Sequence, residues 1–200
     1  MKIIVIGATG TIGTAVAGAL SKRHDVVRVG NRKGDQRVDL ASPDSIKKLF
    51  RAVAPFDAVV CAAGLAKFGP LKELTDEDFK LSFSNKLMGQ INVVRLGLCQ
   101  IADCGSFTLT SGVLSQEPMP GSGAISPVNA GIEGFVRAAA LEMPRGVRIN
   151  AVSPPWVKET LVALGMDPSP GMPAASVAKA YAESVEGTKN GFVIDARAFA

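Results

Sequence analysis

The sequence of 200 residues predicts one α/β domain, spanning residues 1–200, in which helices cover both faces of a doubly wound parallel sheet. Apolar residues make up 47% of the chain and charged residues 20%, as is typical of a buried sheet with packed helices. Unbroken apolar runs such as residues 3–6 are typical of strands buried on both faces. These runs alternate with helix-compatible segments through short connections, a pattern that specifies parallel crossovers.

The N-terminal part of the chain predicts three strands and two helices. A strand at residues 3–6 precedes a helix at residues 11–20, and a second strand occupies residues 26–29. Ser42 and Pro43 supply an N-cap and a proline at the first helical position, which predicts a helix to about residue 54. A third strand follows at residues 57–62.

The remaining elements follow from the same patterns. Thr75 caps an acidic helix start, and apolar positions from residue 79 to about residue 101 predict one long helix. Later elements are expected as a strand at 106–109, a helix at 128–142, a strand at 147–152, a helix at 175–184 and a strand at 191–194. Residues 117–127 and 166–173 are rich in Pro and Gly, and the loops there could cover a pocket; for the second, an ordinary connector is the alternative.

Charge and cysteine content exclude several functions. The net charge of +4 is spread over short basic pairs without interleaved aromatic residues, so no nucleic-acid partner is expected. Three cysteines without paired spacing predict neither a disulfide framework nor a metal site, and indicate a cytoplasmic protein. The first apolar run is too short for a signal peptide or a membrane span, so no membrane association is expected.

A glycine-rich turn joins the first strand to the first helix. Glycines at this place allow a tight bend, a close approach to a pyrophosphate and close helix packing, while free helix amides meet the anion. Because the triplet lies within a complete strand–turn–helix–strand unit, the sequence predicts a Rossmann dinucleotide site. Its expected contacts are Gly7, Thr9, Gly10, Thr11, Ile12 and Gly13.

The end of the second strand favours NADP(H). An acidic residue there would bind the ribose of NAD, whereas a 2′-phosphate requires cationic donors. This chain has Asn31 and Arg32 at that place, with Lys33 alongside, and the planar guanidinium suits a phosphate. The alternatives are a solvated basic loop and NAD(H) binding, for which Asp35 is the candidate acceptor.

The chain resembles the short-chain dehydrogenase/reductase family over nearly its whole length. Asp39-Leu40 resembles the family's pair beside the adenine, and Cys61-Ala62-Ala63-Gly64 resembles its Asn-Asn-Ala-Gly strand end. Residues 148–154 resemble its Val-Arg-Val-Asn-x-Val-x-Pro-Gly segment. Asn85 matches its active-site asparagine, and Ser111 its catalytic serine. The resemblance adds as expected cofactor contacts Asp39, Leu40, Ala62, Ala63, Gly64, Pro154 and Val157.

The family's catalytic tyrosine and lysine, four residues apart, are missing. In the aligned segment Ile125 stands in place of the tyrosine and Asn129 in place of the lysine, so the chain resembles a short, atypical member. The only tyrosine, Tyr181, is expected in the core or an interface. Lys86 is the one lysine considered for donating a proton or holding the ribose, but a surface position is the favoured interpretation. Neighbouring helical side chains diverge by about 100°, so Lys86 and Asn85 need not share a pocket.

Two functions are consistent with these residues. The first is an NADP(H)-dependent oxidoreductase acting on a small carbonyl or alcohol, with a catalytic site built from Asn85, Ser111 and Lys86. The second is a catalytically silent NADP(H)-binding redox sensor or interaction protein. Ser115, Gln116 and Glu117 are further candidates for substrate contact, and Trp156 either walls the pocket or packs in the core. Apolar helix faces could pack against further copies of the chain, so they are consistent with a homodimer or a homotetramer.

Overall fold

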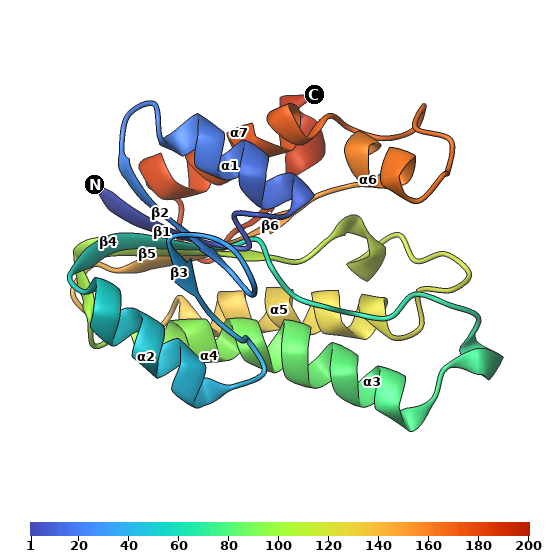
Figure 1. The fold of residues 1–200 in the computed structure, drawn as a ribbon, viewed down its shortest axis with the longest axis horizontal. Coiled ribbons are helices and arrows are strands. Elements are labelled where there is room, and N and C mark those ends of the chain that lie inside the picture. Colours follow the sequence, from blue (N-terminus) through green and yellow to red (C-terminus); the bar gives the residue numbers. More distant parts are fainter.

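The computed structural model describes all residues from 1 to 200 and consists of one parallel sheet between two layers of helices (Figure 1). Seven strands lie in the order β3-β2-β1-β4-β5-β6-β7, and every pairing is parallel. The predicted doubly wound sheet is therefore confirmed. The strands are β1 (Lys2–Ile6), β2 (Asp25–Gly30), β3 (Gln36–Arg37), β4 (Phe56–Cys61), β5 (Ile101–Thr110), β6 (Arg148–Ser153) and β7 (Val193–Asp195).

The helices divide between the two faces as the crossovers require. One face carries α1 (Thr11–Leu20), α6 (Lys158–Ala163) and α7 (Ala174–Glu186), and the other carries α2 (Pro43–Val53), α4 (Met88–Gly97) and α5 (Ile125–Ala139) (Figure 1). The short helix α3 (Asp76–Ser82) leads into α4 through a π-helical turn at Phe83–Leu87. None of the helices has the length and apolar character that a membrane crossing requires.

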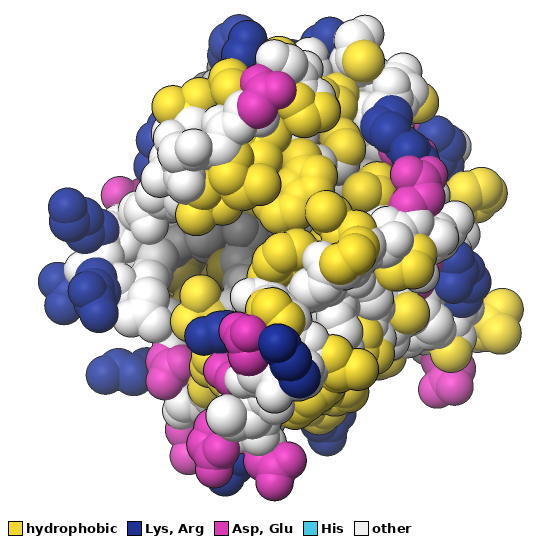
Figure 2. Space-filling model, turned by 90° about the vertical axis from the view of Figure 1, so that its right-hand side faces the viewer, with side chains coloured by type: hydrophobic (Ala, Val, Ile, Leu, Met, Phe, Trp, Pro, Cys, Tyr) yellow, Lys and Arg dark blue, Asp and Glu magenta, His cyan; other side chains and the backbone are white.

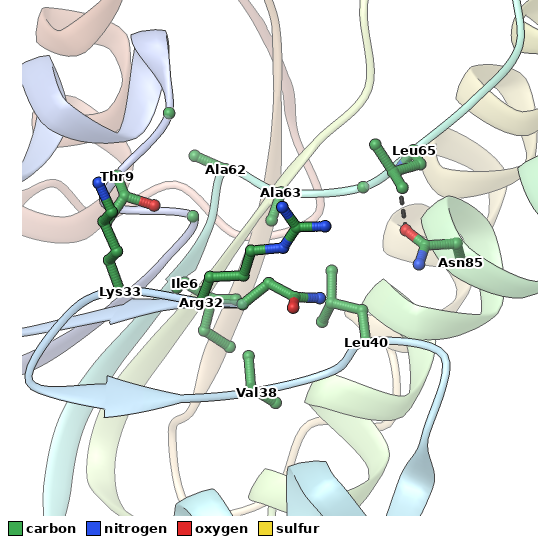
Figure 3. A pocket seen from close by; sticks show the side chains of 15 residues that line it. Ile6, Thr9, Arg32, Lys33, Val38, Leu40, Ala62, Ala63, Leu65 and Asn85 are labelled. Carbon is green, nitrogen blue, oxygen red and sulfur yellow. Dashed lines mark hydrogen bonds between the residues drawn. The ribbon is translucent and has the colours of Figure 1, made fainter.

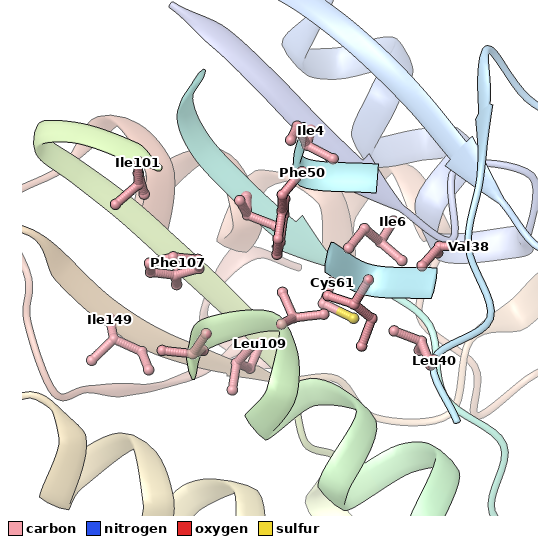
Figure 4. Close-up of a cluster of buried hydrophobic side chains, with 14 of the residues drawn as sticks. Ile4, Ile6, Val38, Leu40, Phe50, Cys61, Ile101, Phe107, Leu109 and Ile149 are labelled. Carbon is pink, nitrogen blue, oxygen red and sulfur yellow. The ribbon is translucent and has the colours of Figure 1, made fainter. Parts of the chain in front are cut away.

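Strand β1 shows why the apolar runs of this sequence are unbroken. Ile4 and Ile6 point into the core under α2, α4 and α5, while Ile3 and Val5 point into the core under α1 and α7. All four side chains are at most 1% exposed. Figure 4 shows the first of these two clusters, where Phe50 of α2 meets side chains from β1, β4 and β5. A strand covered on both faces needs apolar residues at every position.

The turn after β1 depends on backbone atoms approaching one another closely. Gly7 has φ +89°, a conformation that residues with a side chain rarely adopt. A Cβ atom on Gly13 would lie 2.0 Å from the carbonyl oxygen of Gly7, so only glycine lets α1 pack this tightly on the turn. Gly10 caps α1 without a side-chain hydrogen bond, which leaves amide groups of the first helical turn free.

The structure adds elements that the sequence patterns do not predict. Strand β3 has two residues and α6 has six, and both are too short for a periodic pattern to be visible. The predicted long helix at 79–101 contains the π-helical turn and ends at Gly97, because β5 begins at Ile101 rather than at residue 106. Helix α5 begins at Ile125, three residues before the predicted start, so the end of the Pro- and Gly-rich stretch is helical.

Two glycines of α1 provide a matched test of this packing. Gly18→Ala should raise the free energy of unfolding by about 0.5–1 kcal/mol, because nothing lies within 4 Å of the added Cβ and alanine favours the helix. Gly13→Ala should lower it by about 1–3 kcal/mol, because the new Cβ overlaps the Gly7 carbonyl. Urea denaturation of both variants measures the difference, and equal effects would contradict the role assigned to Gly13.

Candidate functional site

Two adjoining cavities open at the edge of the sheet where the strands end. Figure 2 views this edge and shows a hollow bordered by hydrophobic side chains. The glycine-turn cavity, about 570 Å³, is lined by the turn after β1, the loop after β2 and the end of β4. The lysine cavity, about 470 Å³, is lined by Lys86, the ends of β5 and β6, and helices α5 and α6. Gly64 lines the first cavity and contacts Lys86, so the two cavities adjoin there.

Most residues expected to bind a cofactor line one of these two cavities. The glycine-turn cavity receives Gly7, Thr9, Gly10, Asn31, Arg32, Leu40, Ala62, Ala63 and Gly64. The lysine cavity receives Ile12, Pro154 and Val157. Thr11 and Gly13 line neither cavity and lie in the first turn of α1. Asp39 also lines neither cavity, and its carboxylate accepts a hydrogen bond from the amide of Ala41, 2.9 Å away.

The glycine-turn cavity has a basic rim. Figure 3 shows Arg32 and Lys33 extending from the loop after β2 over the cavity. Both side chains are exposed, and neither forms an ion pair within the chain. Asp35, the residue that would favour NAD, instead accepts a hydrogen bond from the amide of Arg28 at 2.9 Å and lies outside this lining. The rim therefore offers two cations and no carboxylate to a bound anion.

Asn85 and Lys86 face different cavities, although they are neighbours in the π-helical turn. Asn85 lines the glycine-turn cavity, where its Oδ1 accepts a hydrogen bond from the amide of Leu65 at 2.8 Å (Figure 3). Lys86 lines the lysine cavity and is 9% exposed, so the surface position considered for this lysine is wrong. A π-helical turn changes the direction of side chains within a helix and often occurs at functional sites.

The Lys86 amine is held between two oxygen atoms. Its Nζ donates to the Oδ1 of Asn129 at 2.7 Å and to the carbonyl oxygen of Ser111 at 3.2 Å, and it forms no ion pair. Burial lowers the pKa of Lys86 from 10.5 to about 8, because the ammonium form loses its hydration. Asn129 is held in turn, since its Nδ2 donates to the carbonyl oxygen of Gly112 at 3.3 Å.

Helix α5 places in one cavity the two positions that the family resemblance aligns with the family's tyrosine and lysine. Ile125 and Asn129, one helical turn apart, both line the lysine cavity. Asn129 contacts Lys86, so an amine from the π-helical turn lies beside the place where the family resemblance expects a lysine from α5. Tyr181 lies elsewhere, fully buried in the core, with its hydroxyl 2.7 Å from the Oγ1 of Thr110. Burial raises the pKa of its phenol.

The other polar candidates are engaged within the protein. The Oγ of Ser111 donates to the carbonyl oxygen of Val152 at 3.3 Å, although the residue lines the lysine cavity. Ser115 and Gln116 bind the carboxylate of the buried Glu133. Glu117 pairs with Arg197 at 2.9 Å and lies outside the cavity lining. Of the ionisable side chains, Lys86 alone lines the lysine cavity.

Among the residues of the cavity wall, the sequence points to Trp156 but gives no signal for Phe68 or Leu164. Phe68 and Trp156 line the lysine cavity with ring centroids 5.9 Å apart in an edge-to-face arrangement, which assigns Trp156 to the wall. Leu164 and Met166 close the same wall and are 61% and 48% exposed. Single apolar residues in a loop form no periodic pattern, so only the tertiary fold identifies them.

The fold and the two cavities define a dinucleotide-binding α/β protein, and comparison with known proteins identifies its family. The family model described as enoyl-(acyl carrier protein) reductase matches residues 8–188. The chain therefore belongs to the short-chain dehydrogenase/reductase family.

Sequence relatives and solved structures agree with this family. Versicolorin reductase stcU of Emericella nidulans is 29% identical over 78% of this chain and 68% of its own length. Hydroxynaphthalene reductase arp2 of Aspergillus fumigatus is 33% identical over 58% of this chain, but the match spans 43% of that reductase. The crystal structure of the protein lin1944 from Listeria innocua has 42% identity and a TM-score of 0.93, with 98% of both chains covered. A small-chain dehydrogenase in complex with NADPH has 26% identity and a TM-score of 0.86 over 98% of this chain and 95% of that one.

Proposed function

We propose that this protein is an NADP(H)-dependent oxidoreductase that interconverts a small carbonyl compound and the corresponding alcohol. The observation that carries the proposal is Lys86, a buried amine without an ion-pair partner in the wall of an apolar cavity that adjoins the glycine turn. Burying a cation costs free energy, and such perturbed groups concentrate at functional sites.

The glycine-turn cavity fits the phosphate-bearing part of a dinucleotide. The free amides at the start of α1 suit a pyrophosphate, and the backbone at Gly7 and Gly13 leaves no room for side chains. Arg32 and Lys33 suit a 2′-phosphate on the rim. When bound, the nicotinamide supplies a hydride to the carbonyl carbon and becomes the oxidised cofactor, so the protein must supply the proton for the product oxygen.

Lys86 is the group suited to hold that proton. A neutral amine has two N–H bonds, and both are accounted for by the Asn129 and Ser111 oxygens, whereas the ammonium has a third N–H bond to offer. We assign this third N–H bond to the carbonyl oxygen of the substrate in the lysine cavity. A pKa of about 8 makes the ammonium a stronger acid than an ordinary lysine, so it transfers a proton at neutral pH more readily.

The first test of this function measures cofactor binding and selectivity. NADPH should bind more tightly than NADH, and Arg32→Ala should weaken NADPH by about 10- to 100-fold while NADH is unchanged, because a charge-assisted bond to the 2′-phosphate is lost. Quenching of Trp156, the single tryptophan, reports binding, and Lys22→Ala is an exposed basic control. Equal losses for both cofactors would contradict the role of Arg32. Tight NADPH binding without turnover of any carbonyl compound would support the silent sensor instead.

The second test follows the protonation of Lys86. The reduction rate, measured as kcat/KM of the NADPH complex, should be constant below pH 8 and fall tenfold per pH unit above it, because the ammonium is the proton donor. Alcohol oxidation should rise through the same range, since it needs the neutral amine. Lys86→Met should remove both dependences and lower the rate by about 10²- to 10⁴-fold. Lys80→Met, on the exposed face of α3, is the control, and an unchanged pH dependence in Lys86→Met would assign the proton to another group.

A third test exchanges the two side chains that meet across the helices. Asn129→Lys should lower both stability and rate, because two buried ammonium groups would be in contact, and Lys86→Asn should lower the rate because the cation is lost. The double variant Lys86→Asn/Asn129→Lys restores one amine beside one amide. Its kcat/KM should therefore exceed, by at least about tenfold, the value expected from combining the losses of the two single variants. Additive losses in kcat/KM and in urea denaturation would show that the two positions act independently.

A further inference from the structure

We propose that the lysine cavity selects a neutral ketone that carries an aromatic ring and a single polar oxygen atom. This inference rests on the proposed function and adds the chemical class of its substrate. Three features of the cavity carry it: the hydrogen-bonding state of its polar side chains, the position of its only cation, and the aromatic pair in its wall.

The polar side chains of the cavity leave one strong donor for a ligand. Asn129 accepts from Lys86 and donates to the carbonyl oxygen of Gly112, and Ser111 donates to the carbonyl oxygen of Val152. Thr160 also lines the cavity, where it is half-buried and its hydroxyl group forms no side-chain hydrogen bond within the chain. The third N–H bond of the Lys86 ammonium is therefore the only charged donor that the cavity offers to a ligand, and it suits one carbonyl oxygen.

This arrangement acts against polar substrates. Each additional hydroxyl group that enters the cavity gives up part of its hydration and meets few free polar partners beyond the Thr160 hydroxyl, which costs free energy. A carboxylate competes with the ketone oxygen for Lys86, because no arginine or second lysine lines the cavity to bind it. A keto acid bound through its carboxylate would leave the ketone without a proton donor. Sugars and keto acids are consequently poor substrates for this site.

The aromatic wall favours a ring. Phe68 and Trp156 meet edge to face at an interplanar angle of 80°, and both line the cavity. Aromatic rings prefer such edge-to-face and offset contacts, so a third ring adds to this pair. Met166 lies in the same wall, and its flexible thioether adapts to the shape of a ring.

Three matched carbonyl compounds test the inference with NADPH as the reductant. Phenylacetone has a ring and one ketone oxygen, hydroxyacetone replaces the ring by a hydroxyl group, and phenylpyruvate replaces the methyl group by a carboxylate. The kcat/KM for phenylacetone should exceed that for each of the other two by about 10- to 100-fold, because a phenyl group is buried and no polar group is stranded. A higher kcat/KM for hydroxyacetone or phenylpyruvate would overturn the inference.

A binding measurement separates this inference from the proposed function. Fluorescence of Trp156 is recorded while phenylacetone or hydroxyacetone is added, with and without NADP⁺, so that no turnover is needed. Saturable quenching by phenylacetone alone supports the ligand class, even if reduction is never observed and the proposed function fails. Absence of quenching by phenylacetone, or equal quenching by both compounds, overturns the ligand class.

Variants of the wall connect the selectivity to its proposed cause. Trp156→Leu and Phe68→Leu keep an apolar side chain but remove a ring, and each should reduce the preference for phenylacetone over hydroxyacetone by about 3- to 10-fold, consistent with the free energy of one aromatic contact. Leu141→Ser is the control, because Leu141 is 88% exposed beyond the end of α5 and does not line the cavity. An unchanged preference in both wall variants would show that the ring is not recognised there.

Discussion

The edge of the sheet that carries both cavities depends on close approaches that only glycine permits. At Gly13 an added Cβ would lie 2.0 Å from a backbone oxygen, and at Gly64 it would lie 2.7 Å from the Lys86 side chain. At Gly112 it would lie 2.9 Å from the Nδ2 of Asn129. The contact at Gly13 packs α1 closely on the first turn. The contacts at Gly64 and Gly112 bring the chain after β4 and β5 close to Lys86 and Asn129. A small change in backbone position here would move the glycine turn and the lysine cavity together.

Burial of the Lys86 amine costs free energy at this edge. An ammonium removed from water is stabilised by hydrogen bonds only in part, and the low pKa of Lys86 reflects the remaining penalty. The fold keeps the side chain in place from three sides, through Asn129, the Ser111 carbonyl and Gly64. Such rigid positioning is what acid–base chemistry requires, since a proton transfers only across a short, aligned contact. The π-helical turn at Phe83–Leu87 directs Asn85 toward one cavity and Lys86 toward the other.

The sequence predicted the sheet and its helical layers because burial on both faces imposes a pattern that a single chain displays. It also predicted the glycine turn, and of the two positions expected for Tyr181, the core or an interface, the structure shows the core. Elements shorter than one or two turns, such as α6, lack the length for such a pattern. The burial of Lys86 was missed because it depends on Asn129, 43 residues later in the chain, and on a π-helical turn that apolar spacing does not specify. Cavity walls such as Phe68 are likewise set by tertiary contacts rather than by local sequence.

The contact between Lys86 and Asn129 also constrains how this site can change during evolution. A lineage that moves the amine from one helix to the other by single substitutions must pass through one of two intermediates, either two buried ammonium groups or two amides. The amide pair introduces no like-charge repulsion, but it lacks the amine. The route without charge repulsion therefore passes through a chain that lacks the amine proposed as the proton donor, and descendants that stop there would keep the cavity but not that donor.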